Sequence, residues 1–330
     1  MQILQPIVHE TVWGGSFLQP FSYSESESIG HLYNIIDSDQ FNNKIIQGTY
    51  EGETLHDWFL DNKKKYHLDR FEKLPFLTAL VEAADNLSIQ VHPDDDSAKA
   101  LENESFGKNE SFYILKTPEM GAMYNGVLTK DKNEFRKAIE QGKTLNYIDK
   151  LECKQGDYVY IVGGTLHAAT KGTITFEIEE NCEHTYRFYD YDRLDSSGKP
   201  RQLQVEKALS SLKPELKSQS VPAAGKHIER MYWSEILEDR EEVKNNTEVF
   251  FFAILLEGET QVKDLKILPG TAVLLEPGDT LILNKNRTVI VGPVVRRLNE
   301  LFPISYVCES TQVDGRNRKL GVNMYFFIPY

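Results

Sequence analysis

The chain has few cysteines, no long apolar run and no excess of basic residues. Its 330 residues include three cysteines, Cys153, Cys182 and Cys308, and no CxxC pair. Widely spaced thiols in odd number exclude a disulfide-stapled fold and favour a reducing compartment, so we expect a cytoplasmic protein. No run reaches the roughly 18 apolar residues of a membrane span, and no basic segment followed by an apolar one opens the chain, so we expect neither membrane insertion nor a signal peptide.

Positive charge is also scarce. The sequence has 37 Lys and Arg against 50 Asp and Glu, a formal net charge of −13. Nucleic acids and anionic membranes are bound by displacing counterions with basic side chains, so neither is an expected partner. A small anionic substrate stays possible, but it needs a local cluster of Arg and Lys.

What the sequence does contain is β-forming residues. Aromatic residues make up 11% of the chain, with 17 Phe and 16 Tyr. Short strands broken by turns, such as 158–162 and 173–179, recur at close spacing and predict a mainly β protein of the sandwich, barrel or jelly-roll kind. Helical patterns interrupt them near Thr54, at 130–142 and at 202–212.

A polar stretch with prolines and small residues, 212–226, has the composition of a linker. We therefore predict a metal-binding catalytic domain with helical insertions at 1–220 and a second β-rich domain at 221–330. No histidine follows His227, so the second domain is expected to be free of metal.

Three stretches carry polar residues in a common pattern. In "NLSIQVHPDD", Gln90 and His92 share one face of an alternating strand. In "FGKNESFYIL", Glu110 opens an apolar strand and Lys108 lies two residues earlier. In "GDYVYIVGGTLHA", a strand and a Gly-Gly turn precede His167. Taken singly each is weak, because a lone strand histidine is more often structural and a buried glutamate is more often paired with a lysine.

Together the three stretches resemble the two-part signature of the cupin jelly roll, which implies two cupin-type jelly rolls with a few inserted helices. Gly156, Gly164 and His167 have the offsets of the second part, with Val162 where proline is usual. The resemblance implies that separate strands bring together four ligands to one divalent metal: Gln90, His92, Glu110 and His167. One amide oxygen, two imidazoles and one carboxylate suit Zn²⁺, with Fe²⁺, Mn²⁺ and Co²⁺ as competitors.

Longer motifs resemble the short bacterial type I mannose-6-phosphate isomerases (phosphomannose isomerases). They include "LSIQVHPDD", "GGTLHAATKGTITFEIEE", "TYRFYDYDRLDSSGKPRQLQVEKAL" and the early "VWGG". The resemblance implies one Zn²⁺ per chain, Arg187 and Lys108 as catalytic residues and Trp13 as a substrate contact. It also implies a sugar-phosphate substrate, mannose 6-phosphate or fructose 6-phosphate, interconverted through a cis-enediol.

This chemistry explains the residue types. The proton to be removed lies next to a carbonyl, and the enediolate that develops needs nearby positive charge, which a metal and a guanidinium supply. Arg187 stays charged and is a poor proton shuttle, whereas Lys108 can serve as one if its pKa falls. The sequence leaves the catalytic base unassigned. Arg193, Lys199 and Arg201 are phosphate contacts by location, or else solvated loop charges.

Two departures from the family pattern leave the substrate open. Ala79 replaces the lysine of LPxLxKxLxA, and the residues from Gly30 to Tyr33 replace a Gly-Glu-Ser-Trp stretch. The alternatives are a metal-dependent isomerase of a related or unphosphorylated sugar, or a non-catalytic sugar-binding cupin. Retention of Lys108 and Arg187 beside four metal ligands argues against the non-catalytic alternative. Oligomeric state does not follow from the sequence.

Overall fold

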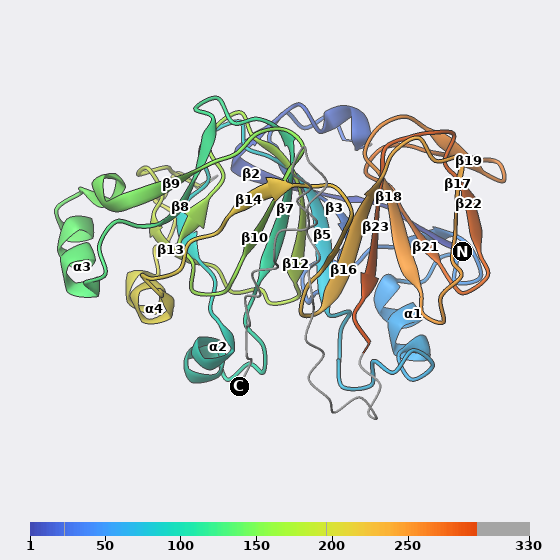
Figure 1. Ribbon diagram of the computed structural model, residues 1–330, viewed down its shortest axis with the longest axis horizontal. Helices are drawn as coiled ribbons and strands as arrows, with labels where there is room; N and C mark the ends of the chain where they lie inside the picture. The colour runs from blue at the N-terminus through green and yellow to red at the C-terminus, as the bar shows by residue number, and fades with distance from the viewer. Residues whose placement is uncertain (23, 196, 296–330) are drawn as a thin grey trace, which may run out of the picture. The chain divides into compact units, whose positions relative to one another are not determined.

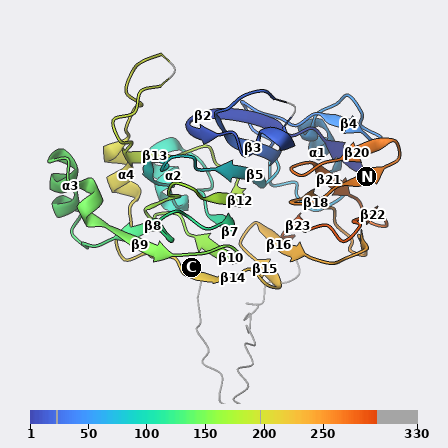
Figure 2. The same ribbon diagram turned by 90° about the horizontal axis from the view of Figure 1, so that it is seen from above.

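Antiparallel sheets dominate the protein, as predicted. The structure, a computed structural model, describes residues 1–22, 24–195 and 197–295. Cys308 and the end of the predicted second domain lie outside these residues. Three large sheets follow one another across Figures 1 and 2, and we call them the five-stranded sheet, the central sheet and the C-terminal sheet.

The central sheet has seven strands in the order β14 (Ser220–Pro222), β10 (Asp157–Ile161), β7 (Glu110–Lys116), β12 (Ile174–Glu180), β5 (Phe76–Glu82), β3 (Ile29–Ile35) and β2 (Ile7–Gly15). The five-stranded sheet runs β13 (Tyr186–Tyr189), β6 (Ile89–Val91), β11 (His167–Ala168), β8 (Ala122–Val127) and β9 (Ile148–Glu152).

The C-terminal sheet runs β15 (Lys226–Ile228), β16 (Tyr232–Leu237), β23 (Thr288–Pro293), β18 (Phe251–Leu255), β21 (Ala272–Leu275), β1 (Gln2–Leu4) and β4 (Ile45–Gln47). Two smaller pairs accompany it, β17 (Glu242–Lys244) with β22 (Thr280–Ile282) and β19 (Thr260–Val262) with β20 (Leu265–Ile267).

The described helices are α1 (Leu55–Asn62), α2 (Asp95–Glu102), α3 (Lys132–Glu140) and α4 (Val205–Ser211), with 3₁₀ turns at Gln19–Phe21 and Thr144–Tyr147. In Figure 1, α2, α3 and α4 lie on the side of the five-stranded sheet, and α1 lies on the side of the C-terminal sheet. Helices α1, α3 and α4 match the predicted patterns. Helix α2 was not expected, because Ala98 is its one buried residue and leaves no apolar periodicity to detect.

Alternation along β12 shows why the central sheet separates the core from a polar face. Phe176 and Ile178 pack with Phe252 and Ile254 of β18 in one large apolar cluster. Glu177, which lies between Phe176 and Ile178, points to the opposite face. One face of the central sheet is therefore covered by the C-terminal sheet, and the other is available for a polar site.

Two long-range strand pairings were not expected. Strand β1 pairs with β21 and with β4, so residues near the N-terminus complete the C-terminal sheet. Strand β14 lies within the predicted linker and pairs with β10 of the central sheet. The domain division at residue 220 stays a prediction.

Candidate metal centre and substrate cavity

Three adjacent strands align polar residues across the five-stranded sheet. Gln90 of β6 lies opposite His167 of β11 on one side and opposite Arg187 of β13 on the other. Directly opposed residues of antiparallel strands project to the same face. Three short strands that are far apart in the sequence thus carry an amide, an imidazole and a guanidinium side by side.

The backbone after β6 is held by two close glycine contacts, which fix His92. The Gly164 N–H donates to the His92 carbonyl at 2.8 Å, and the Lys108 N–H donates to the Pro93 carbonyl at 2.9 Å. A Cβ on Gly107 or Gly163 would lie 2.3 or 2.7 Å from the Pro93 oxygen. Only glycine permits this approach, which explains the Gly-Gly turn of the sequence motif.

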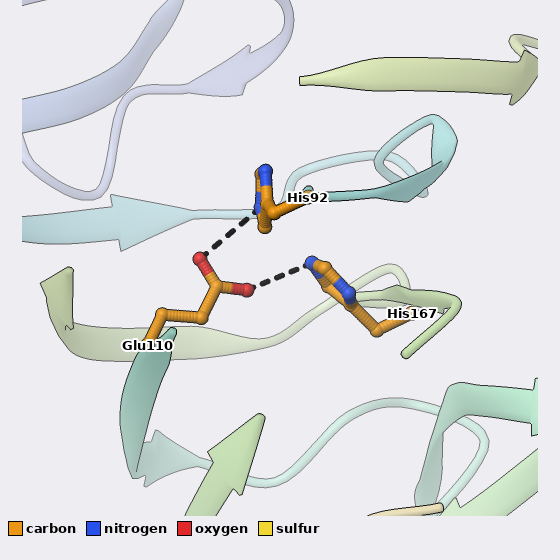
Figure 3. A group of neighbouring side chains, drawn as sticks. All are labelled: His92, Glu110 and His167. Atoms are coloured by element: carbon orange, nitrogen blue, oxygen red, sulfur yellow. Dashed lines mark ion pairs between the residues drawn. The ribbon is translucent and has the colours of Figure 1, made fainter. Parts of the chain in front are cut away.

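Glu110 lies between the two histidines (Figure 3). His167 Nε2 is 2.7 Å from Glu110 Oε1, and His92 Nε2 is 3.3 Å from Glu110 Oε2. All three residues are buried, and their ligand atoms lie within 4.8 Å of one another. Among the described residues, these three side chains form the group whose geometry could hold a metal ion.

The outer nitrogens of the two histidines fix their tautomers. His92 Nδ1 lies 3.0 Å from the His184 carbonyl, and His167 Nδ1 lies 3.0 Å from the Thr165 carbonyl. A carbonyl only accepts, so each Nδ1 carries a proton, and each ring turns its Nε2 toward Glu110.

The cluster also contains ligand atoms that have no hydrogen-bond partner within the described chain. His92 Nε2 and Glu110 Oε1 are buried and have no hydrogen-bond partner among the described residues. Burial lowers the pKa of His92 to about 4, with Lys108 adding to the effect, so the ring is neutral at pH 7. A carboxylate and two imidazole lone pairs aimed at one point fit a divalent cation.

Gln90, the fourth predicted ligand, borders the cluster through its amide. Its Nε2 lies 3.5 Å from His167 Nε2, and its Oε1 accepts from the Ser88 hydroxyl at 3.0 Å. A half-turn of the amide brings Oε1 to the cluster and leaves Nε2 beside the Ser88 hydroxyl. Because a hydroxyl both donates and accepts, Ser88 can bond either orientation.

Lys108 is buried beside the cluster as part of an ion pair. Its Nζ donates to Glu179 Oε2 and lies 4.0 Å from Glu110 Oε2. Burial alone lowers the pKa of this ammonium, but Glu179 and Glu110 together raise it above the ordinary value. In this arrangement the side chain is a fixed positive charge. The shuttle role requires the opposite shift, and it stays a prediction.

Arg187 has no ion pair with any carboxylate of the described residues, and its Nε is buried without a hydrogen-bond partner there. Asp190, a plausible partner three residues after Arg187, instead binds Arg193 at 2.5 Å and Arg201 at 3.3 Å. Burial and the neighbouring Arg201 lower the pKa of Arg187. Its half-buried charge therefore faces the cavity and is not neutralised by an ion pair in the cavity wall.

A cavity of about 320 Å³ lies in front of the cluster. Gln90, His92, Glu110, His167, Lys108 and Arg187 all line it, and so do Trp13 and Arg201. Arg193 and Lys199 are not among its lining residues. Arg193 is committed to Asp190 and to the Asn86 carbonyl, 2.6 Å away, while Lys199 is exposed. The phosphate role of all three basic residues stays a prediction.

The cavity also contains residues that the motifs did not single out. Glu177 and Glu179 line it from β12, where the alternation of "TITFEIE" could have placed them on the polar face. Burial raises the pKa of Glu177 well above its ordinary value, and Glu110 and Glu179 add to the rise. The Thr175 hydroxyl donates to Glu177 Oε1 at 2.7 Å. His9 and Tyr33 line the cavity as well. No sequence signal marked His9, whereas Tyr33 ends the stretch that departs from the family pattern.

Packed antiparallel sheets around a buried His/Glu/His group define a cupin-type protein with a candidate metal centre. The family model for "Phosphomannose isomerase type I, catalytic domain" matches residues 1–129. The probable mannose-6-phosphate isomerase GmuF of Bacillus subtilis is 33% identical over 237 residues, which cover 71% of this chain and 72% of that protein. Mannose-6-phosphate isomerase of Streptococcus mutans is 34% identical, over 63% of this chain and 66% of that protein.

Solved structures agree. The mannose 6-phosphate isomerase of Bacillus subtilis superposes with a TM-score of 0.72 at 28% identity, covering 88% of this chain and 98% of that one. A putative mannosephosphate isomerase from Archaeoglobus fulgidus has the same fold, with a TM-score of 0.71 at 18% identity and coverage of 88% and 97%. The chain belongs to the type I mannose-6-phosphate isomerase family. No helix in the described part of the chain has the length and apolarity to cross a membrane.

Proposed function

We propose that the protein is a zinc-dependent aldose–ketose isomerase that interconverts mannose 6-phosphate and fructose 6-phosphate through a cis-enediol. The observation that carries this proposal is the set of facing ligand atoms at His92, Glu110 and His167, next to an Arg187 that has no carboxylate partner within the described part of the chain. Family membership supports the substrate. Gln90 completes the proposed ligand set after its amide turns.

Each residue has a part that follows from its charge and position. His92, Glu110, His167 and Gln90 hold the zinc ion, which when bound acts as a Lewis acid toward oxygens of the substrate. Arg187 supplies a permanent positive charge for the enediolate oxygen, in a cavity whose burial strengthens the interaction. Lys108 is a second fixed charge beside Glu110 and is kept in place by Glu179.

The phosphate is assigned to the Arg201 end of the cavity. Arg201 lines the cavity, and its carboxylate partner Asp190 is shared with Arg193. Arg193 lies closer to Asp190, at 2.5 Å, and also pairs with Asp85 at 3.7 Å. Asp190 is the one carboxylate within 4 Å of Arg201 among the described residues, at 3.3 Å, and because it is shared the Arg201 charge is only partly offset, which suits a phosphate dianion. Trp13, which is 5% exposed, closes the cavity as an apolar substrate contact.

A coupled assay with mannose 6-phosphate tests the proposal. Protein stripped with a chelator should lose turnover, and about one equivalent of Zn²⁺ per chain should restore it. Unphosphorylated mannose should be a much poorer substrate. Turnover that survives chelation with no detectable bound metal contradicts the metal role, and zinc-loaded protein that does not convert mannose 6-phosphate contradicts the proposed substrate.

A further inference from the structure

Two neighbouring strands give the cavity a wall without charged side chains. His9 and Thr11 of β2 line the cavity, and so do His31 and Tyr33 of β3. We call these four residues the β2–β3 wall. His9 and His31 are direct cross-strand partners, and alternate residues of a strand share a face, so the four side chains form one continuous patch.

The rings of this wall support one another. His9 and His31 stack at 5.4 Å between ring centroids with planes 14° apart, and His31 and Tyr33 stack at 5.2 Å with planes 7° apart. The edge of Trp13 packs on His31 at 5.0 Å, and Phe41 packs on His9 at 5.3 Å. Rings held on several sides lose little freedom on binding, so the wall is preorganised.

The wall has polar atoms that bond to nothing in the described protein. His9 Nδ1, Thr11 Oγ1 and His31 Nδ1 are buried without hydrogen-bond partners there. A buried polar group left without a partner costs on the order of 1–3 kcal/mol. Three such atoms on one patch of a cavity indicate a surface that a polar ligand completes.

The wall is also neutral. Burial lowers the pKa of His31 to about 3, and His9 adds to the effect. Burial and then Arg201 lower the pKa of His9. A neutral imidazole has one donor and one acceptor, as a hydroxyl group does, and therefore suits a sugar hydroxyl better than a phosphate.

The wall lies between the two ends of the proposed substrate site. Arg201, the proposed phosphate contact, is near enough to His9 to act on its charge. Lys108 and Glu110, at the metal end, are near enough to act on His31, in opposite directions. A chain of hydroxyl-bearing carbons between phosphate and reacting carbons would lie along this wall.

We propose that the β2–β3 wall is the subsite for the hydroxyl-bearing carbons of the substrate, with Thr11 and His31 as specificity-determining residues. The inference rests on the proposed function and deepens it. His31 and Tyr33 lie in the stretch that departs from the Gly-Glu-Ser-Trp pattern, so this selectivity is a property of this chain.

Binding of a substrate-like molecule that cannot react tests the inference. Mannitol 6-phosphate has no carbonyl, and inorganic phosphate has no carbon chain, so calorimetry with each on zinc-loaded protein separates the wall from the phosphate end. His31→Ala should weaken mannitol 6-phosphate binding about tenfold, the loss of roughly one good hydrogen bond. It should change inorganic phosphate binding less than twofold. His31→Gln, which retains a donor and an acceptor, should recover part of the loss.

Thr11→Val is the sharper variant because it removes an unpaired hydroxyl without changing shape. It should leave the melting temperature unchanged or raise it, yet weaken mannitol 6-phosphate binding about threefold to tenfold. Val12→Ala is the matched control. Val12 belongs to the same strand, is 40% exposed and does not line the cavity, so its loss should leave binding of both molecules unchanged.

The outcomes separate the inference from the proposed function. Normal mannitol 6-phosphate affinity in both wall variants overturns the inference, as does an equal loss for inorganic phosphate. Failure of the wild type to bind mannitol 6-phosphate also overturns it. If the wild type binds this molecule but does not isomerise mannose 6-phosphate, the proposed function fails, and the wall is still judged by its variants.

Discussion

At the scale of single residues, charges in this site are either paired or left unpaired, and the unpaired ones point to function. Lys108 is neutralised by Glu179, and Asp190 by Arg193. Arg187 has no such partner in the described chain. A half-buried guanidinium without an ion pair loses hydration on folding, and here the distant charge of Asp190 offsets this loss only in part, since the pKa of Arg187 is lowered. We infer that its charge is retained for an anionic oxygen of the reacting substrate.

Arg187→Ala should lower kcat by about 10²–10³, the range found for loss of one stabilising donor at a developing oxyanion. Bound zinc should stay near one equivalent, and the melting temperature should change little, because no carboxylate loses its partner. His92→Ala should instead lose zinc and activity together. Measuring kcat, zinc and melting temperature on each preparation separates the two roles.

Arg136→Ala is the matched arginine control for this experiment. Arg136 of α3 binds Glu206 of α4 at the surface and is 37% exposed, so turnover should be unchanged. If Arg187→Ala retains normal kcat per zinc-loaded, folded molecule, Arg187 has no catalytic role. If it loses stability in proportion to activity, its role is structural.

At the scale of elements, the site depends on the contact between the segment after β6 and two glycine turns. This segment follows His92 and leads into α2, which Asp94 caps by accepting from the Ser97 N–H at 3.0 Å. Gly107 and Gly163 close on its backbone from two different loops. The position of His92 is thus set by backbone packing rather than by its own strand alone.

Gly107→Ala should lower zinc affinity. The added Cβ would lie 2.3 Å from the Pro93 oxygen and 2.5 Å from the Asp94 carbonyl carbon, both backbone atoms. The segment must therefore move, and His92 with it. We expect a loss of about 10–100-fold in metal affinity, as for other groups that orient a ligand, measured by competition with a chelating dye.

Ser105→Ala, at an exposed position two residues earlier, is the control and should bind zinc normally. Unchanged affinity in folded Gly107→Ala protein contradicts the view that this contact positions His92.

At the scale of the whole molecule, sequence patterns predicted what local spacing determines. The alternation that places Gln90 and His92 on one face, the β-rich class and three of the helices all follow from short segments. The ligand set came from resemblance, since spacing alone does not bring 92, 110 and 167 together. The stacking of His9 on His31 could not be predicted from the sequence, because it depends on strand pairing that no local signal encodes. The pairing of β1 within the C-terminal sheet could not be predicted for the same reason.

A buried polar network joins the central and C-terminal sheets. The Ser111 hydroxyl lies 2.6 Å from the hydroxyls of both Tyr158 and Tyr232. The Tyr158 hydroxyl in turn donates to Glu229 Oε1 at 2.8 Å. Ser111 follows Glu110 on β7 and points to the other face, so the strand that carries the carboxylate ligand is tied through this network to β16.

The network gives the stability of the protein a dependence on pH. Burial raises the pKa of Glu229 to about 7 from an ordinary 4.5; the Tyr158 bond opposes the shift and Glu180 adds to it. Between these pH values the folded protein binds more protons than the unfolded chain, so this group's contribution to stability falls as pH rises.

Glutamine stays neutral and accepts the same bond. Glu229→Gln should therefore match the wild type near pH 4.5 and exceed it by about 1–3 kcal/mol at pH 8. Urea unfolding at each pH measures the difference. Tyr158→Phe retains the glutamate but removes the bond that opposes the pKa shift, so it should be less stable throughout and should lose stability with rising pH at least as steeply as the wild type. Parallel curves for wild type and Glu229→Gln from pH 4.5 to 8 contradict this account of how the two sheets are joined.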